Sequence, residues 1–226
     1  MKPVGYLTAT EGAITGDPGL FYNYIQGGNG IFVQAKNPLM GAIIPIAPVE
    51  IRGLAPVTEA VNLINGKVPR RLYDLAFSVF LAHPSEEHYL AITWRDGEYH
   101  IEYPPQSKNG GGVEYQRPKN IFMDIHSHSQ MPAFFSGTDN RDETGFQLYL
   151  VIGKVDGNPE YRLRIGIYGY FKELNFEEVF DDCIISTMAL PELLDPIQSS
   201  SPDAAERGRT SQKGLAGFFQ DIFKSS

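Results

Sequence analysis

The chain has 226 residues, of which 42% are hydrophobic, 12% aromatic and 20% charged. This composition is typical of a folded protein, and the length suits one core domain with additions or two small domains. The formal net charge is −8, so no general positive field favours nucleic acid or anionic lipid. The sequence contains no apolar stretch of about 20 residues and begins without the apolar core of a signal peptide. We therefore expect a cytoplasmic protein that binds neither nucleic acid nor a membrane.

Residues 1–67 are predicted to form a β-rich N-terminal region. The segments FYNYIQ and GIFVQAK flank the turn sequence GGNG, which predicts a β-hairpin. The segment MGAIIPIAPVEI predicts a further strand, and its prolines favour an edge strand or an interrupted one. We expect a small β layer that packs on the main domain and carries no chemistry of its own.

Residues 68–195 are predicted to form the main domain. In PRRLYDLAFSVFLAHP the apolar residues recur at helical spacing, Pro69 suits the start of a helix and Pro84 marks its end. Strands are predicted for EHYLAITW, EYHIEYPP, NIFMDIHSH, QLYLVIGKV and YRLRIGIYGYF. The segment TDNRDETG predicts a short helical turn at most, and the glycine-rich residues 105–119 predict a loop or a flexible excursion.

Residues 196–226 begin with the linker-like composition of QSSSPDAAERGRTSQ. In the following GLAGFFQDIFKSS, five apolar residues share one helical face: Leu215, Phe218, Phe219, Ile222 and Phe223. This pattern predicts a flexible linker and a C-terminal amphipathic helix, which either docks on its own domain or binds a groove of a partner.

The stretch DIHSHSQMPAFFSGTD, residues 124–139, concentrates potential metal ligands. Alternate side chains of a strand point the same way, so His126 and His128 can present two imidazoles to one point. A chain reversal through QMPAFFSG would bring back Asp139 as a third ligand. Two histidines and a carboxylate suit Zn²⁺, and three protein ligands leave a fourth position for water, as in catalytic zinc sites. Ser136 is placed to stabilise an oxyanion, whereas a general base must come from elsewhere.

The spacing H-x-H, seven residues, S-x-x-D resembles the signature of the JAMM metalloproteases, the JAB or MPN-plus family. It is filled by His126, Ser127, His128, Ser136 and Asp139, and the resemblance covers roughly residues 68–170. It implies a zinc-dependent peptidase or isopeptidase that cleaves after the C-terminal tail of a ubiquitin-like protein. It also implies an α+β fold, with a JAB/MPN-like mixed β-sheet flanked by helices in a cytidine-deaminase-like layering, to which the N-terminal β region is added.

In this family the general base is a glutamate near the start of the strand that follows the helix, where the chain has Glu86 and Glu87. Glu86 stands two residues after Pro84, as the acid often does in the family. The resemblance therefore favours Glu86 as the catalytic base, with Glu87 as the alternative. Many members have a proline after the second histidine and a glycine shortly after the glutamate, where this chain has Ser129 and Tyr89. Neither position is a metal ligand, so the departures concern the substrate groove.

The whole chain also resembles one bacterial branch of the family, the A proteins of the PRTRC cassette, which is named for its ParB-related and ThiF-related members. The cues are GNGIFVQAKNP, RGLAP, the E-x-H-Y-L-A-I-T-W strand, the PPQ and VEY segments, and the phenylalanine-rich C-terminus. The resemblance implies two partners from the same cassette, a small ubiquitin-like protein and a ThiF/E1-like enzyme.

Two other functions stay open: a non-catalytic MPN-like scaffold that binds proteins, and a zinc hydrolase whose substrate is unrelated to ubiquitin. A serine nucleophile is disfavoured because Ser127 has no available histidine as its base. The other histidines, His83, His88 and His100, lack metal-ligand spacing and are interpreted as surface or core residues. GGNG and GGG lack the strand–helix setting of a phosphate-binding loop.

Overall fold

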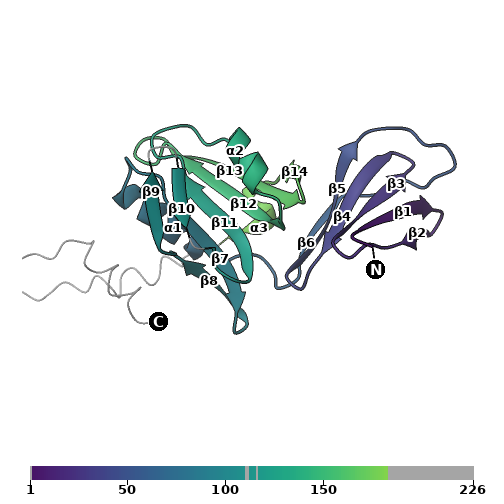
Figure 1. The fold of residues 1–226 in the computed structure, drawn as a ribbon, viewed down its shortest axis with the longest axis horizontal. Coiled ribbons are helices and arrows are strands. Elements are labelled where there is room, and N and C mark those ends of the chain that lie inside the picture. The colour runs from purple at the N-terminus through teal and green to yellow at the C-terminus, as the bar shows by residue number, and fades with distance from the viewer. Residues whose placement is uncertain (1, 110–111, 116, 183–226) are drawn as a thin grey trace, which may run out of the picture. The chain divides into compact units, whose positions relative to one another are not determined.

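The computed structural model describes residues 2–109, 112–115 and 117–182. In this part of the chain the fold is mostly β, with two six-stranded mixed sheets and helices of 13, 6 and 4 residues (Figure 1). The predicted α+β fold, a JAB/MPN-like sheet flanked by helices in a cytidine-deaminase-like layering, is therefore wrong. The N-terminal region, expected to be a small layer, supplies a sheet with as many strands as the other.

Short connections explain the low helical content. β7 (Tyr89–Arg95) and β8 (Glu98–Glu102) are joined by two residues, and so are β13 (Glu160–Ile167) and β14 (Tyr170–Glu173). Antiparallel neighbours can be joined by such tight turns, whereas parallel neighbours need a longer crossover. Most strands of the second sheet are antiparallel to their neighbours, so the described chain has little sequence left over for helices that would cover both faces.

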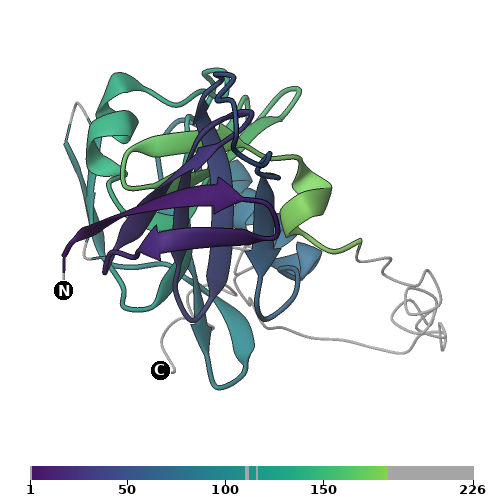
Figure 2. The ribbon, with the colours of Figure 1, turned by 90° about the vertical axis from the view of Figure 1, so that its right-hand side faces the viewer.

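The first sheet has the strand order β2-β1-β3-β4-β5-β6. Its strands are β1 (Val4–Thr10), β2 (Ala13–Asp17), β3 (Tyr22–Gly27), β4 (Gly30–Lys36), β5 (Met40–Ala47) and β6 (Ala60–Leu63). β1 pairs with β3 in parallel, and the other neighbours are antiparallel (Figure 2, where β1 and β2 face the viewer). The hairpin predicted around GGNG is confirmed as β3 and β4. Pro45 lies past the part of β5 that pairs with β6, so the strand is an edge at that point.

The second sheet has the order β14-β13-β12-β11-β7-β8, with the parallel strands β11 (Ile121–Ser127) and β12 (Phe146–Gly153) in the middle. Residues opposite one another in register share a face of the sheet. One face is apolar and includes Met123, Leu148 and Ile165. The other face carries polar side chains, including Asp124, Tyr149 and Arg164.

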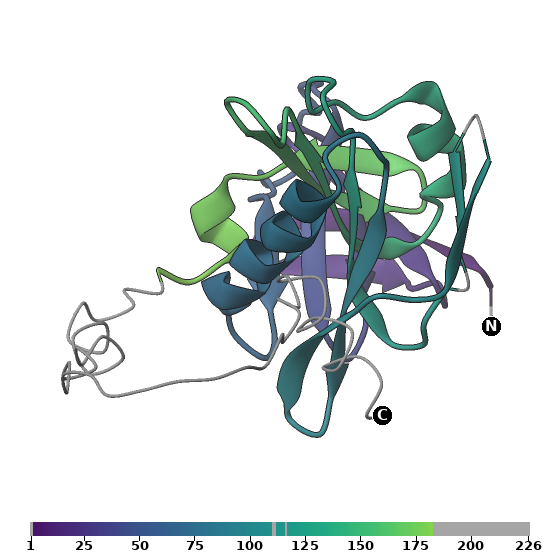
Figure 3. The ribbon, with the colours of Figure 1, turned by 90° about the vertical axis from the view of Figure 1, so that its left-hand side faces the viewer.

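The helix predicted after Pro69 is confirmed as α1 (Arg70–Ala82), which lies against the second sheet (Figure 3). Its buried residues lie four positions apart on one stripe: Leu72, Ala76 and Phe80. They belong to the same hydrophobic core as the apolar face of the second sheet. Pro69 precedes the first turn, and the Asp181 carboxylate accepts a hydrogen bond from the Arg70 backbone N–H at 2.8 Å.

The glycine-rich segment 105–119, predicted to be a loop, instead contains an antiparallel hairpin, so this prediction is wrong. The hairpin consists of β9 (Gln106–Asn109) and β10 (Gly112–Tyr115). The Gln106 side chain accepts from the Tyr89 backbone N–H at 3.0 Å and donates to the Tyr89 carbonyl at 3.1 Å. The side chain thus takes the place of a neighbouring strand beside the start of β7.

Two short helices complete the described chain, α2 (Gly137–Asp142) and α3 (Phe176–Val179). The sheets belong to one compact unit, in which the hydroxyls of Tyr24 and Tyr170 lie 2.6 Å apart.

Among the described helices, none has the length and apolar character needed to cross a bilayer. The predicted linker and amphipathic helix of residues 196–226 lie outside the described residues, as does the end of the predicted main domain.

Candidate metal centre

The end of β11 presents two histidine side chains toward one another. His126 is in the strand and His128 follows it, and their Nε2 atoms lie 3.3 Å apart. Ser127, between them, points to the opposite face, where its hydroxyl oxygen accepts a hydrogen bond from the His88 backbone N–H at 3.0 Å. The structure therefore confirms the prediction, made from strand alternation, that the two imidazoles converge.

The surroundings of His128 fix the direction of its ring. Its Nδ1 lies 3.2 Å from the Pro132 carbonyl oxygen, and the Phe134 ring packs on it edge to face. A carbonyl oxygen can only accept, so in the neutral ring Nδ1 carries the proton and Nε2 has the lone pair that can bind a metal. The His128 backbone N–H also donates to the Ile152 carbonyl at 2.8 Å, which ties the turn to the end of β12.

Asp139 is held at the third corner of the site by the first turn of α2. The Ser136 backbone N–H donates to Asp139 Oδ2 at 2.5 Å, and the Ser136 hydroxyl accepts from the Asp139 backbone N–H at 3.1 Å. This reciprocal pair is a capping box, which gives the S-x-x-D spacing a structural cause. The other oxygen, Oδ1, lies 3.7 Å from His126 Nε2.

The three side chains have the spacing of a metal-binding group. Ligand atoms of His126, His128 and Asp139 all lie within 4.8 Å of one another. Zinc–ligand bonds of 2.0–2.1 Å place tetrahedral donor atoms about 3.3 Å apart, close to the 3.3 and 3.7 Å separations of the structure. The group is a possible metal site, partly buried, and its N/N/O donor set suits Zn²⁺ and neighbouring first-row divalent cations.

The electrostatic environment keeps His126 in its metal-binding form. The pKa of the imidazole is lowered from 6.5 to about 4. Burial is the main cause, Asp139 acts in the opposite direction, and the nearby His128 and Arg164 add to the lowering. The ring is therefore neutral at pH 7, as a metal ligand must be.

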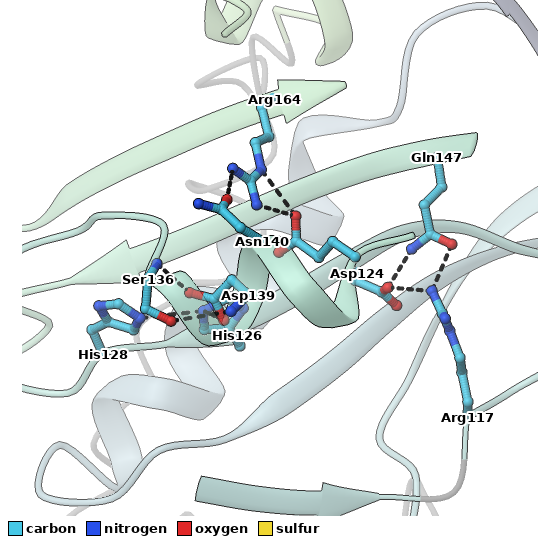
Figure 4. A network of polar contacts seen from close by, with 10 residues as sticks. Arg117, Asp124, His126, His128, Ser136, Asp139, Asn140, Gln147 and Arg164 are labelled. Carbon is cyan, nitrogen blue, oxygen red and sulfur yellow. Dashed lines mark hydrogen bonds and ion pairs between the residues drawn. The ribbon is translucent and has the colours of Figure 1, made fainter. Parts of the chain in front are cut away.

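A buried arginine anchors α2 to the second sheet (Figure 4). Arg164, in β13 and only 5% exposed, donates from Nε and Nη2 to Glu143 Oε2 at 2.9 and 2.5 Å, and from Nη1 to Asn140 Oδ1 at 2.7 Å. Its guanidinium carbon lies 3.6 Å from the ring centre of Phe135 and 3.7 Å from that of Phe171. Since Asn140 follows Asp139 directly, these contacts hold the third ligand in place. The sequence reasoning passed over Arg164, although a charged residue between Leu163 and Ile165 in an apolar strand was an available signal.

A second buried network lies on the same face, two residues before His126 on β11. Asp124 accepts hydrogen bonds from the Gln147 amide and from Arg117 Nη2, the latter at 2.8 Å (Figure 4). It also accepts one from the Tyr89 hydroxyl. Burial raises the pKa of the Asp124 carboxyl, and the charge of Arg117 opposes this rise. The network joins β7, β11 and β12 beneath the candidate centre.

The two candidate glutamates lie differently with respect to the centre. Glu86 Oε2 is 3.5 Å from His88 Nε2, on the face of the sheet to which Ser127 points. Tyr89 pairs with His126 across the strands, and residues two apart on a strand share a face. Glu87 lies two residues before Tyr89, just ahead of β7, so the same alternation, continued back, favours the face of the centre for its side chain. The group of His126, His128 and Asp139 contains neither glutamate. Glu86 as the base stays a prediction, and the strand register favours the alternative, Glu87.

No protein-family model matches this chain, and no curated protein is significantly similar to it. The likeness to the JAMM metalloproteases therefore depends on the motif residues themselves.

Proposed function

We propose that the protein is a zinc-dependent hydrolase that cleaves a peptide or isopeptide bond, with the metal held by His126, His128 and Asp139. The convergence of these three donors, at separations of 3.3 and 3.7 Å, is the observation that carries the proposal. Structural zinc sites usually have four protein ligands, and three are present in this group of the described chain. A position is thus left for water or substrate.

A cation in this site supplies Lewis acidity and lowers the pKa of a water molecule. The residues of the chain supply the metal ligands, the oxyanion donor and the general base. His126 and His128 would each donate a nitrogen lone pair to the cation, and Asp139 would add a carboxylate oxygen. The Ser136 hydroxyl oxygen is occupied by the Asp139 backbone N–H, so its proton is directed elsewhere and can be donated to an oxyanion of the substrate.

A carboxylate must accept the proton of the attacking water and deliver it to the leaving amine. We assign this role to Glu87, because the alternation of β7, continued back from Tyr89, favours the face of His126 for its side chain. Glu86 is the alternative. It is half-exposed and its carboxylate is directed at His88, on the other face.

The substrate class comes from the resemblance of the H-x-H, S-x-x-D residues to the JAMM metalloproteases. We propose cleavage after the C-terminal tail of a small ubiquitin-like protein that is handled by a ThiF/E1-like enzyme of the same PRTRC cassette. The motif supports this substrate class.

The test is hydrolysis of a ubiquitin-like protein that carries a C-terminal extension, followed by intact-mass spectrometry. The matched variants are Glu87→Gln and Glu86→Gln, each with its metal content measured. We expect Glu87→Gln to lose at least about 100-fold in kcat while it keeps the metal, and Glu86→Gln to stay active, because general-base catalysis contributes about 10²–10⁴-fold. Full activity in both single variants and in the double variant would exclude a glutamate base at this position.

The same assay separates the other two functions. Cleavage of unrelated peptides, with no cleavage of the ubiquitin-like fusion, would support a zinc hydrolase of another substrate. Binding of the fusion without hydrolysis, by protein loaded with zinc, would support a non-catalytic scaffold.

A further inference from the structure

A second group of potential ligands lies between the end of α1 and the start of β7. It consists of His83, Glu86 and His88, whose ligand atoms all lie within 4.8 Å of one another. We call this group the His83 cluster. It lies on the face to which Ser127 points, so the strand pair of β7 and β11 separates it from His126.

The local chain geometry creates the His83 cluster. His83 is the C-terminal cap residue of α1, and its backbone N–H donates to the Phe80 carbonyl at 3.0 Å. The Glu86 backbone N–H then donates to the His83 carbonyl at 3.2 Å, which closes a turn and brings the two side chains together. His88 enters the sheet two residues later, where its carbonyl accepts from the Ser127 backbone N–H at 2.9 Å.

His88 has the surroundings of an oriented metal ligand. It is 3% exposed, and its Nδ1 lies 2.7 Å from the Tyr103 hydroxyl. Its Nε2 is directed at Glu86 Oε2, 3.5 Å away. Metal-bound histidines usually have their second ring nitrogen held by such a hydrogen bond, which fixes the ring orientation.

The other two members complete a donor set that is open to solvent. The rings of His83 and His88 have centroids 5.1 Å apart and are tilted by 39°, so they do not stack face to face. His83 and Glu86 are exposed, which gives an ion access from solvent. The distance of 3.5 Å between His88 Nε2 and Glu86 Oε2 is close to the distance of about 3.3 Å between two ligand atoms in a tetrahedral zinc site.

We propose that His83, Glu86 and His88 form a second binding site for Zn²⁺ or a similar first-row divalent cation. The ion would tie the end of α1 to the start of β7, on the sheet face opposite the first site. Because the two sites share no ligand, the second does not depend on the proposed hydrolase function. It also assigns Glu86 a role that differs from that of a catalytic base.

The test is the zinc content of the purified full chain after equilibrium dialysis against Zn²⁺, measured by plasma mass spectrometry. We expect two ions per chain in the wild type, and one in either His83→Ala or Glu86→Gln. Both residues are exposed, so these variants should fold, which circular dichroism checks. Glu87→Gln, which changes the neighbouring carboxylate outside the cluster, is the matched control and should keep two ions.

Asp139→Asn separates this proposal from the proposed function. Asp139→Asn should also retain one ion, and its combination with His83→Ala should retain none. The second site is refuted if His83→Ala and Glu86→Gln both bind as much zinc as the wild type, with affinities within threefold. A wild-type content of one ion that is lost in Asp139→Asn refutes only the second site. A single ion that is lost in His83→Ala refutes only the first.

Discussion

The buried Arg164 makes the most specific prediction about how the fold positions the metal ligands. We consider the substitution Arg164→Met, which keeps an unbranched apolar stem between Phe135 and Phe171 but removes the charge. The Glu143 carboxylate, 8% exposed, would lose two hydrogen bonds and its positive partner. Asn140, next to Asp139, would lose the donor at 2.7 Å.

The magnitude follows from burial. Removing one partner of a buried ion pair costs about 3–5 kcal/mol, because the remaining carboxyl group must either keep its charge inside the protein or take up a proton. The neighbouring arginine on the same strand provides a matched control: Arg162 pairs with Glu173 at 3.6 Å, and both side chains are more than half exposed. Arg162→Met should cost less than about 1 kcal/mol, as exposed pairs do. The double variant Arg164→Met, Glu143→Leu should recover most of the loss, because no buried charge is left unpaired.

The assay has two readouts, urea unfolding of the metal-free protein and calorimetric titration with Zn²⁺. Arg164→Met should lower the free energy of unfolding by about 3–5 kcal/mol and weaken zinc binding by about 10–100-fold, the usual effect of losing a group that orients a ligand. An Arg164→Met variant no more destabilised than Arg162→Met, or a double variant less stable than Arg164→Met, would contradict this prediction.

Three further predictions concern the parts that hold the ligands. In metal-free protein, NMR titration should place the pKa of His126 near 4. In the unfolded chain the same histidine takes up its proton near pH 6.5, so the free energy of unfolding should fall as the pH drops from about 6.5 to 4. A pKa near 6.5 in the folded protein would contradict this. Ser136→Ala should lower the free energy of unfolding in urea by about 1 kcal/mol and weaken Zn²⁺ binding, because the capping box of Ser136 and Asp139 is lost. Ser136→Thr keeps a hydroxyl, so a Ser136→Thr variant as impaired as Ser136→Ala would argue against capping. Gly153→Ala should destabilise the protein by about 1–3 kcal/mol, because the added Cβ would lie 2.4 Å from backbone atoms of Met131 and Ala133. Gly157→Ala is the control and should be nearly neutral, because the nearest atom to its Cβ is 3.9 Å away.

The confirmed predictions are those in which a local pattern and burial agree. α1 carries its apolar residues at helical spacing and is bounded by Pro69 and Pro84, and the hairpin of β3 and β4 surrounds a glycine turn. Convergence of His126 and His128 followed from strand alternation alone. In each case the residues that decide the structure lie within a few positions of one another.

Most of what the sequence left wrong, missed or open depends on pairing between distant segments. The α+β fold was taken from a motif resemblance, which contains no information on how many strands the N-terminal region adds. The role of Arg164 depends on the register of β12 and β13, and the His83 cluster depends on where α1 ends relative to β7. The choice between Glu86 and Glu87 likewise depends on the pairing of Tyr89 with His126. Local propensity does not determine such registers.

The central claim is that His126, His128 and Asp139 bind one divalent cation together. Anomalous diffraction at the zinc absorption edge, on crystals of the full chain grown with Zn²⁺, tests it most directly. We predict a peak about 2.0–2.2 Å from Nε2 of both histidines and from Oδ1 of the aspartate. Ordered side chains at these three positions, with no anomalous peak between them, would contradict it.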